Sequence, residues 1–239
     1  MATSPAVPVP LPVHLAVAEP GADRNRLTAL IRLIMVIPQW LVLIFVHLAA
    51  LVVVIIGWFA ALFTGRLPQF ATDFLSGVVR WDARVSGYFY FLTDKYPPFS
   101  LDQEPGYPIQ IAVPAGGPLN RLAVLLRFFI AIPAWIVIAV ANSGLGIFSI
   151  GSWFMVVVTG RLPGPLFEVT RSVIRYQSRL YGYYWMLTPE YPWGLFGDPE
   201  GSEMQAPGWA IRLSETARGT MVALLVVGAA VELVNLVRR

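Results

Sequence analysis

The chain carries one sequence twice, at an offset of 95 residues. With no gap, positions 25–97 are identical to positions 120–192 at 26 of 73 places. The motif Thr-Gly-Arg-Leu-Pro stands at 64–68 and again at 159–163. A gapless duplication indicates that one structural unit was built twice, so a physical property of one half is expected in the other. A feature present in one copy alone therefore carries less weight as a sign of function.

The composition is that of an integral membrane protein. Hydrophobic residues make up 56% and charged residues 13% of the 239 residues, whereas an ordinary soluble domain carries about 25% charged residues. Eight Trp and nine Tyr fit side chains that anchor helix ends at the membrane interface. The absence of Cys excludes disulfides, thiolate metal sites and cysteine nucleophiles.

Five parts follow one another along the chain. Short alternating stretches at 13–17 and 109–113 predict strands, and 209–213 predicts a third. The strands are expected outside the bilayer, and the tail is expected to form one transmembrane helix. The parts are a Pro-rich extended N-terminus (1–12), two membrane repeat units (13–98 and 107–193), an acidic Gly/Pro loop (194–208) and a partial third unit (209–239).

Each unit contains a long stretch of 33 residues without a formal charge, at 33–65 and at 128–160. A straight helix of that length would measure roughly 50 Å, but the hydrocarbon core is only about 30 Å thick. Two arrangements remain open. The stretch is either a hairpin that turns near 47–50 and 142–144, or a short interfacial helix up to Pro38 followed by a single crossing.

The positions of the arginines favour the hairpin. Arginines flank each uncharged stretch at both ends, and positively charged flanks prefer the cytoplasmic side. A hairpin keeps all of them on one side, whereas a single crossing separates Arg32 from Arg66. We therefore predict an all-α, multi-pass protein of the bacterial cytoplasmic membrane, built from two units of apolar hairpin plus interfacial amphipathic helix.

The last part of each unit predicts an amphipathic helix, over about Phe70–Leu92 and Leu166–Leu187. One polar stripe on each opposes a face rich in Val, Phe, Trp and Tyr, which is typical of a helix in the headgroup plane. A central crossing would bury two arginines at about 2.5–3.5 kcal/mol each. The stripe residues are Asp73, Gly77, Arg80, Arg84 and Gly87, and in the second copy Glu168, Ser172, Arg175, Arg179 and Gly182.

Six arginines are candidates for binding lipid headgroups, because a guanidinium meets phosphate oxygens with two parallel hydrogen bonds. The alternative is structural. In the repeated motif, Gly caps a helix, Arg complements its dipole and Pro stops it; on the amphipathic helices, the arginines reach solvent or pair with Asp73, Asp82 and Glu168. The candidates are Arg66, Arg80, Arg84, Arg161, Arg175 and Arg179.

The remaining titratable residues give weaker indications. His47 aligns with Asn142 in the second copy, and His14 aligns with Gln110 in the second strand, so neither histidine predicts a metal or haem ligand. Glu232 is an acid inside the terminal apolar helix and is a candidate for contact with a partner. The sequence predicts no metal and no cofactor.

The repeated positions hold Arg, aromatic residues, Gly and Pro, with few acids and no His. No nucleophile elbow, phosphate loop or zinc-ligand spacing occurs, and general acid–base chemistry needs groups that titrate near neutral pH. We expect a non-enzymatic accessory or scaffold subunit of a membrane complex that meets its partner through the C-terminal helix and binds no nucleic acid. The alternative is an anionic-lipid-binding or lipid-transport protein.

Three repeated motifs resemble an uncharacterised bacterial membrane family. They are Ile-Pro-x-Trp at 37–40, Phe-Thr-Gly-Arg-Leu-Pro at 63–68 and Leu-Thr-Asp-Lys-Tyr-Pro at 92–97. The family is a domain of unknown function common in actinobacteria, with Phe-Thr-Gly-Arg-Tyr-Pro as its usual motif, and the resemblance covers roughly residues 12–192. It implies membrane location but no activity, and no catalytic residue is carried across. The second unit departs at Val158 and at Pro189-Glu190.

Overall fold

The computed structural model describes residues 13–18, 24–114, 116–198 and 211–238. The predicted Pro-rich segment 1–12 and residues 199–208 of the predicted acidic loop lie outside that part of the chain. The elements are β1 (His14–Val17), α1 (Arg26–Thr64), α2 (Gln69–Phe89), β2 (Ile109–Ala112), α3 (Arg121–Ile130), α4 (Ile132–Thr159), α5 (Gly164–Tyr184) and α6 (Glu215–Val237). Three stretches are long and apolar enough to cross a membrane: α1, α3 with α4, and α6.

The predicted hairpins are wrong. Helix α1 runs without a break through 47–50, and α4 runs through 142–144. A continuous helix pairs every backbone N–H and C=O within the segment, whereas a turn at membrane depth would leave some unpaired. The small residues that suggested a turn serve packing instead, since Gly144 lies against the backbone of Leu224 in α6.

The two units differ at the repeated proline. Pro38 lies inside α1, whereas its copy Pro133 is among the first two residues of α4, after a break at Ala131 that separates α3 from α4. Proline has no N–H for the bond to the preceding turn, so it tolerates the first turn of a helix best. The second unit thus partly adopts the alternative of a short helix followed by a long one.

The Thr-Gly-Arg-Leu-Pro motif ends a helix in both copies, as predicted. Gly65 and Gly160 adopt left-handed conformations, with φ of 74° and 72°, and their N–H groups bond to the preceding turn. The residues that precede the first helix of the other unit then bind the carbonyl of each glycine. The N–H of Leu119 donates to the carbonyl of Gly65 at 2.8 Å, and that of Arg24 donates to the carbonyl of Gly160 at 2.6 Å.

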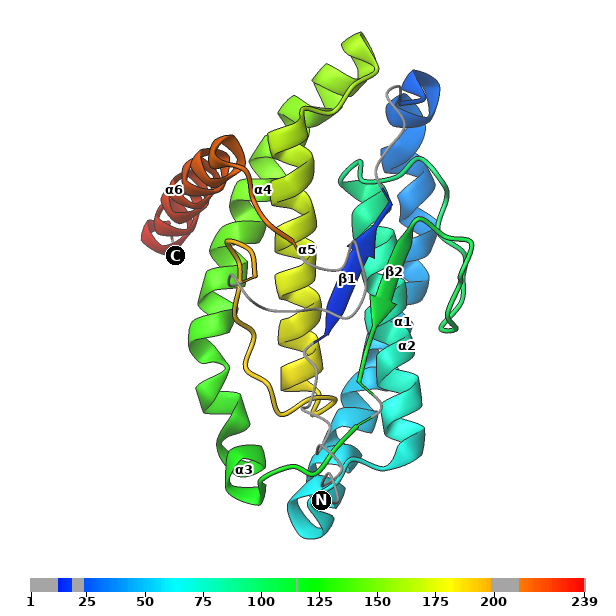
Figure 1. Cartoon of the computed structure of the whole chain (residues 1–239), viewed down its shortest axis with the longest axis vertical. Coiled ribbons are helices and arrows are strands. Elements are labelled where there is room, and N and C mark those ends of the chain that lie inside the picture. Colours follow the sequence, from blue (N-terminus) through cyan, green and yellow to red (C-terminus); the bar gives the residue numbers. More distant parts are fainter. Residues whose placement is uncertain (1–12, 19–23, 115, 199–210, 239) are drawn as a thin grey trace, which may run out of the picture.

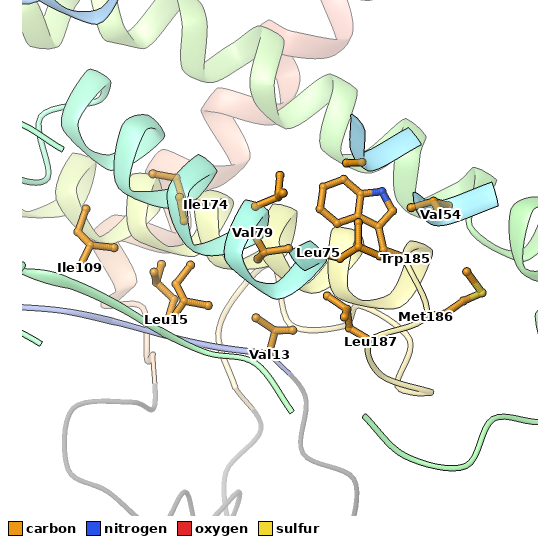
Figure 2. Packing of buried hydrophobic residues seen from close by; sticks show 14 of the residues in the cluster. Val13, Leu15, Val54, Leu75, Val79, Ile109, Ile174, Trp185, Met186 and Leu187 are labelled. Atoms are coloured by element: carbon orange, nitrogen blue, oxygen red, sulfur yellow. The ribbon is translucent and has the colours of Figure 1, made fainter. Parts of the chain in front are cut away.

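Three layers make up the molecule. α1 and α4 form one outer layer, α2 and α5 form the middle layer, and β1 and β2 cover the opposite face of α2 and α5 (Figure 1). Leu15 and Ile109 point from the strands toward Val79 and Ile174 of the middle helices, and Val54 of α1 closes the core from the other side (Figure 2). The expectation of an exposed basic stripe on α2 and α5 is wrong, because Arg84, Arg175 and Arg179 are buried.

The two strands pair antiparallel, with Leu15 opposite Ile111. β1 packs on α5 of the second unit, and β2 packs on α2 of the first, so each amphipathic helix is covered by the strand that precedes the other unit. The predicted third strand lies partly outside the described residues, and its described part makes only an isolated bridge between Arg212 and Gly197.

Helix α6 packs against its own chain. It contacts α4 and α5, and a Cβ added at Gly228 would lie 2.0 Å from the carbonyl oxygen of Val140. Such a close approach of two helices requires small residues at the contact. In Figure 1 α6 is strongly foreshortened while α1, α2, α4 and α5 run up the picture, so α6 crosses the layers.

Candidate functional site

A chain of four polar side chains links the four long helices near their midpoints. Nε2 of His47 on α1 lies 4.0 Å from Oδ1 of Asp82 on α2. Gln177 on α5 donates to Oδ2 of Asp82 at 3.4 Å, and Asn142 on α4 donates to Gln177 at 3.4 Å. We call these four residues the polar chain. Ionisable side chains among apolar helices are costly, which makes His47 and Asp82 candidates for function.

The polar chain is built on the sequence repeat. His47 and Asn142 are 95 residues apart, and so are Asp82 and Gln177. The contact within the first unit, from α1 to α2, therefore has its counterpart within the second, from α4 to α5, and the bond between Asp82 and Gln177 joins the two halves. The first copy holds an ionisable pair at the place where the second holds two amides.

The ring of His47 is oriented by its own helix. Nδ1 lies 2.8 Å from the carbonyl oxygen of Leu43, and a carbonyl only accepts, so Nδ1 carries a hydrogen. A neutral ring would therefore turn a bare Nε2 toward the carboxylate of Asp82, at a distance of 4.0 Å. Burial raises the pKa of Asp82, while His47 and Gln177 oppose that rise.

Aromatic rings surround the ionisable pair on the α5 side. The centroids of Tyr181 and Trp185 lie 6.5 and 6.2 Å from that of His47, and these two rings stack at 4.9 Å. The side chains of His47 and Asp82 keep 35% and 18% of their exposure, so the pair is accessible at an otherwise apolar surface. The repeat gave no reason to single out His47, because its copy is Asn142. Only the fold brings Asp82 beside it.

The candidate arginines on α5 lie inside the protein. Arg175 and Arg179 both bind Asp198, and Nη2 of Arg179 lies 3.0 Å from Oδ1 of Asp198. Arg179 also donates to the carbonyl of Val13 at the start of β1. Burial lowers the pKa of Arg175 to about 10. These contacts fasten the loop after α5 and the first strand to the helix.

The matching arginines on α2 lack that carboxylate. Gln103 stands at the position equivalent to Asp198, and Arg84, which is buried, donates to the carbonyl of Ser100. Arg80 is half-buried. Burial lowers the pKa of Arg84, and the charge of Glu104 opposes this shift most strongly. None of the three predicted acids Asp73, Asp82 and Glu168 pairs with these arginines in the described contacts.

The two arginines of the repeated motif are exposed and lie at opposite ends of the α1–α4 layer. Arg66 follows α1 beside Arg121, because Gly65 lies near the Nε of Arg121. Arg161 follows α4 beside Arg26, because Gly160 lies near the Nε of Arg26. Of the six candidates, these two are the ones whose side chains face outward.

Glu232 has a partner within the chain. Its carboxylate accepts a hydrogen bond from the hydroxyl of Ser143 on α4. The carboxylate thereby joins α6 to α4 close to the tight contact between Gly144 and Leu224. Glu232 remains half-exposed on its other side.

Two buried arginines in the apolar segments were not singled out from the sequence. Arg32 donates to the carbonyls of Tyr88 and Thr93, and its copy Arg127 donates to those of Tyr183 and Thr188. Arg32 therefore caps the carbonyls at the end of α2, and Arg127 caps those at the end of α5, where the helix dipole favours a cation. The sequence does contain an indication of their importance, since both arginines recur at the repeat offset and each directly precedes an uncharged stretch.

An apolar groove of about 1090 Å³ lies between α3, α4, α6 and the loop at 191–196. Aliphatic residues of the three helices line one side, and Tyr191, Trp193 and Phe196 line the other. Among the described residues, no three His, Cys, Asp or Glu side chains come together in a way that could hold a metal ion.

Comparison with known proteins identifies the repeat. One family, described as a domain of unknown function (DUF4389), matches residues 26–100 and again residues 121–195. No curated protein matches the chain, and no solved structure matches it. The expected actinobacterial origin stays a prediction. Because the two matches cover more than half of the sequence and coincide with α1–α2 and α3–α5, the chain belongs to the DUF4389 family and contains two tandem copies of its domain.

Proposed function

We propose that the chain is a non-enzymatic accessory subunit of a complex in the bacterial cytoplasmic membrane and that the polar chain is its point of contact with a membrane protein partner. The observation behind this proposal is the half-exposed pair of His47 and Asp82 on an otherwise apolar helix surface. An interhelical hydrogen bond in a membrane contributes about 0.6–2 kcal/mol, so such a pair gives a partner helix its register.

The proposed contact surface differs from the one expected from the sequence. The terminal helix was expected to meet the partner, but α6 packs on α4 and α5, and Glu232 bonds to Ser143. The outward side of α6, with Val226 and Leu236 exposed, remains available as a secondary contact. The pair on α1 and α2 is the more specific feature, because it combines charge with an apolar surround.

The repeat supplies a conservative variant to test the proposal. The double variant His47→Asn with Asp82→Gln gives the first unit the residues of the second, so the interior keeps its shape and loses its charge. We expect native mass spectrometry of gently solubilised protein to find a stoichiometric protein partner on the wild type and not on this variant. The exposed acid Asp102 gives a control, Asp102→Asn, which should keep the partner. A wild type without a partner, or a variant that retains it, contradicts the proposal.

Binding of an anionic lipid is the second candidate function, and the apolar groove favours it. An acyl chain fits a groove lined by aliphatic and aromatic residues, and Arg66 and Arg161 are exposed cations at the ends of the layer. Val137→Trp would fill the groove, and the pair Arg66→Gln with Arg161→Gln would remove the cations. Retained phosphatidylglycerol in native mass spectra should fall in both variants, and unchanged retention contradicts lipid binding.

A further inference from the structure

We propose that α1 and the α3–α4 pair lie in the plane of one membrane leaflet, with their exposed apolar faces in the hydrocarbon and the sheet in water. The occupant of this apolar face is therefore the acyl region of a single leaflet. This arrangement replaces the multi-pass topology expected from the sequence. It does not depend on the proposed subunit role.

The length of the exposed apolar surface is the first reason. Leu27 and Phe63 stand at opposite ends of α1 and are 68% and 72% exposed. They are 36 residues apart, or about 54 Å along the helix at about 1.5 Å per residue. Fitting 54 Å into a hydrocarbon core of about 30 Å requires a tilt of about 56° from the normal, whereas spanning helices tilt by about 20° on average and about 40° at most.

Unit two has the same surface. Leu122 and Val158 are 64% and 53% exposed, again 36 residues apart. Between the ends of α1, exposed large hydrophobic residues follow one another, and none of the exposed positions is polar. On α3–α4 they run up to Val137 and again from Ile147, and α6 packs against the segment between them. Those on α1 include Leu33, Ile34, Ile37, Leu41, Ile44, Phe45, Leu48, Leu51, Val52, Ile55, Ile56 and Phe59.

The position of the sheet is the second reason. β1 and β2 run beside the middle of α5 and α2, not beyond their ends (Figure 1). If α1 crossed the bilayer, this two-stranded sheet and its unpaired edges would lie at hydrocarbon depth. Open sheet edges do not occur there, because their N–H and C=O groups find no partner. With α1 in the plane of the leaflet, the sheet lies on the far side of α2 and α5, in water.

Charged residues on the loops agree with this placement. Asp102 on the loop before β2, beside Ile109 and Ile111, and Arg212 in the bridge beside α5 are exposed on the sheet side of the molecule. Exposed positions between Leu33 and Phe63 of α1, on the opposite side, carry no charge. The molecule thus has one charged face and one apolar face, which is the pattern of a protein that lies on a membrane.

The basic ends of the layer are the third reason. Arg66 lies beside Arg121 at one end, and Arg161 lies beside Arg26 at the other. A spanning orientation places these two groups on opposite sides of the membrane, against the preference of arginine for the cytoplasmic side. In the plane of the leaflet, both groups meet the same anionic headgroup layer, at about 1 kcal/mol for each basic residue near the surface.

The absence of Cys makes depth measurement direct. Single cysteines at Leu27, Phe45 and Phe63, all on the exposed side of α1, carry a nitroxide in the full-length protein reconstituted into phosphatidylcholine–phosphatidylglycerol vesicles. The accessibility of each label to oxygen and to a water-soluble nickel complex gives its depth. We expect the three depths to agree within about 5 Å, since an in-plane helix is buried about 5–10 Å.

Three further labels calibrate the result. A label at Gln103, exposed near β2, should be in water, and labels at Val222 and Leu236 should differ in depth because α6 crosses the layers. A deep label at Phe45 with shallow labels at both Leu27 and Phe63 overturns the proposal, and so does a water-exposed Phe45. Ile34 and Phe59 serve as substitute positions if a labelled variant does not fold. A loss of partner binding would leave these depths unchanged, so the two proposals fail separately.

Discussion

Arg32 and Arg127 make the same pair of contacts to the end of the amphipathic helix of their unit, α2 or α5, but only Arg32 has a carboxylate beside it. Each donates to two backbone carbonyls, and each guanidinium lies 4.5 Å from the centre of a tyrosine ring, Tyr88 or Tyr183. Asp94 forms an ion pair with Arg32. At the equivalent position the second unit has Pro189. The carbonyls and the ring therefore suffice to hold the buried guanidinium of Arg127 in the second unit.

This comparison predicts a modest cost for Asp94→Asn. The variant leaves Arg32 in the environment that Arg127 already occupies, so only one charged hydrogen bond is lost, at about 1.5–3 kcal/mol. We expect a lower midpoint of thermal unfolding in detergent. Asp102→Asn, at an exposed loop position, is the matched control and should leave the midpoint unchanged. An equal midpoint for Asp94→Asn and wild type would show that the ion pair is not stabilising.

The contact between α6 and α4 predicts that Gly228 does not tolerate a side chain. A Cβ at this position would lie 2.0 Å from the carbonyl oxygen of Val140 and 2.9 Å from the N of Gly144, and neither backbone atom can move without displacing its helix. Gly228→Val should therefore detach α6 and lower the unfolding free energy by more than about 3 kcal/mol, beyond the usual range for overpacking.

The control for that variant lies on the same helix pair. Nothing lies within 4 Å of a Cβ built at Gly146, so Gly146→Ala should be neutral or should stabilise α4 by about 0.5–1 kcal/mol. Limited proteolysis in the segment before α6 measures the detachment. Equal cleavage of Gly228→Val and Gly146→Ala would contradict the packing of α6 described above.

Local sequence signals predicted the helix ends well. The Thr-Gly-Arg-Leu-Pro motif ends α1 and α4 because its glycine, arginine and proline act within a single turn. The strand at 109–113 was predicted for the same reason, since β2 needs only period-two alternation. Such features depend on neighbours in sequence, and a sequence displays those neighbours directly.

Features that depend on how the two units pack were not predictable. The Asn-Ser-Gly segment at 142–144 looks like a turn, but its glycine is required by α6, which lies some 80 residues away in the chain. The repeat also misled the interpretation of His47. It was discounted because its copy is Asn142, yet each of these residues contacts the amphipathic helix of its own unit, and the bond between Asp82 and Gln177 joins the two contacts.

The ion pairs of Asp198 with Arg175 and Arg179 predict that the stability of the fold depends on pH in the acid range. Burial alone would raise the pKa of Asp198, but Arg175, the backbone N–H of Ile211 and Arg179 together lower it below its ordinary value. A carboxyl with a lower pKa in the folded state stabilises the fold above its unfolded pKa of about 4, and this contribution is lost as the pH falls through the folded value.

Asp198→Asn removes that contribution. It leaves two buried guanidinium groups without their counter-charge, at about 3–5 kcal/mol for a fully buried pair. The difference in unfolding free energy between wild type and variant should be largest near neutral pH and should shrink below about pH 4. Denaturant unfolding at several pH values measures it. A difference that does not change with pH would mean that the charge of Asp198 is not what stabilises the loop.

The pKa of Asp82 is shifted in the opposite direction from that of Asp198. This difference allows a test of whether Asp82 serves function or stability. Burial raises its pKa, so the ionised form is disfavoured in the folded state, and the group destabilises the fold at pH values above its raised pKa. Asp82→Asn keeps the shape and the bond to Gln177 without the charge. We therefore expect the variant to unfold at a higher temperature than wild type at neutral pH, with the gain disappearing below about pH 4, where both side chains are neutral.

The charged groups near Asp82 are few, with His47 at 4.0 Å the only ion-pair partner recorded for it among the described residues. His47→Asn should add to the destabilising effect of Asp82 in the wild-type background and should have little effect once Asp82 is Asn. If Asp82→Asn raises the stability and also abolishes binding of the protein partner, the carboxylate serves binding at the expense of stability. If Asp82→Asn instead lowers the unfolding temperature at neutral pH, the ion pair with His47 is structural, and the polar chain loses its claim to be the contact site.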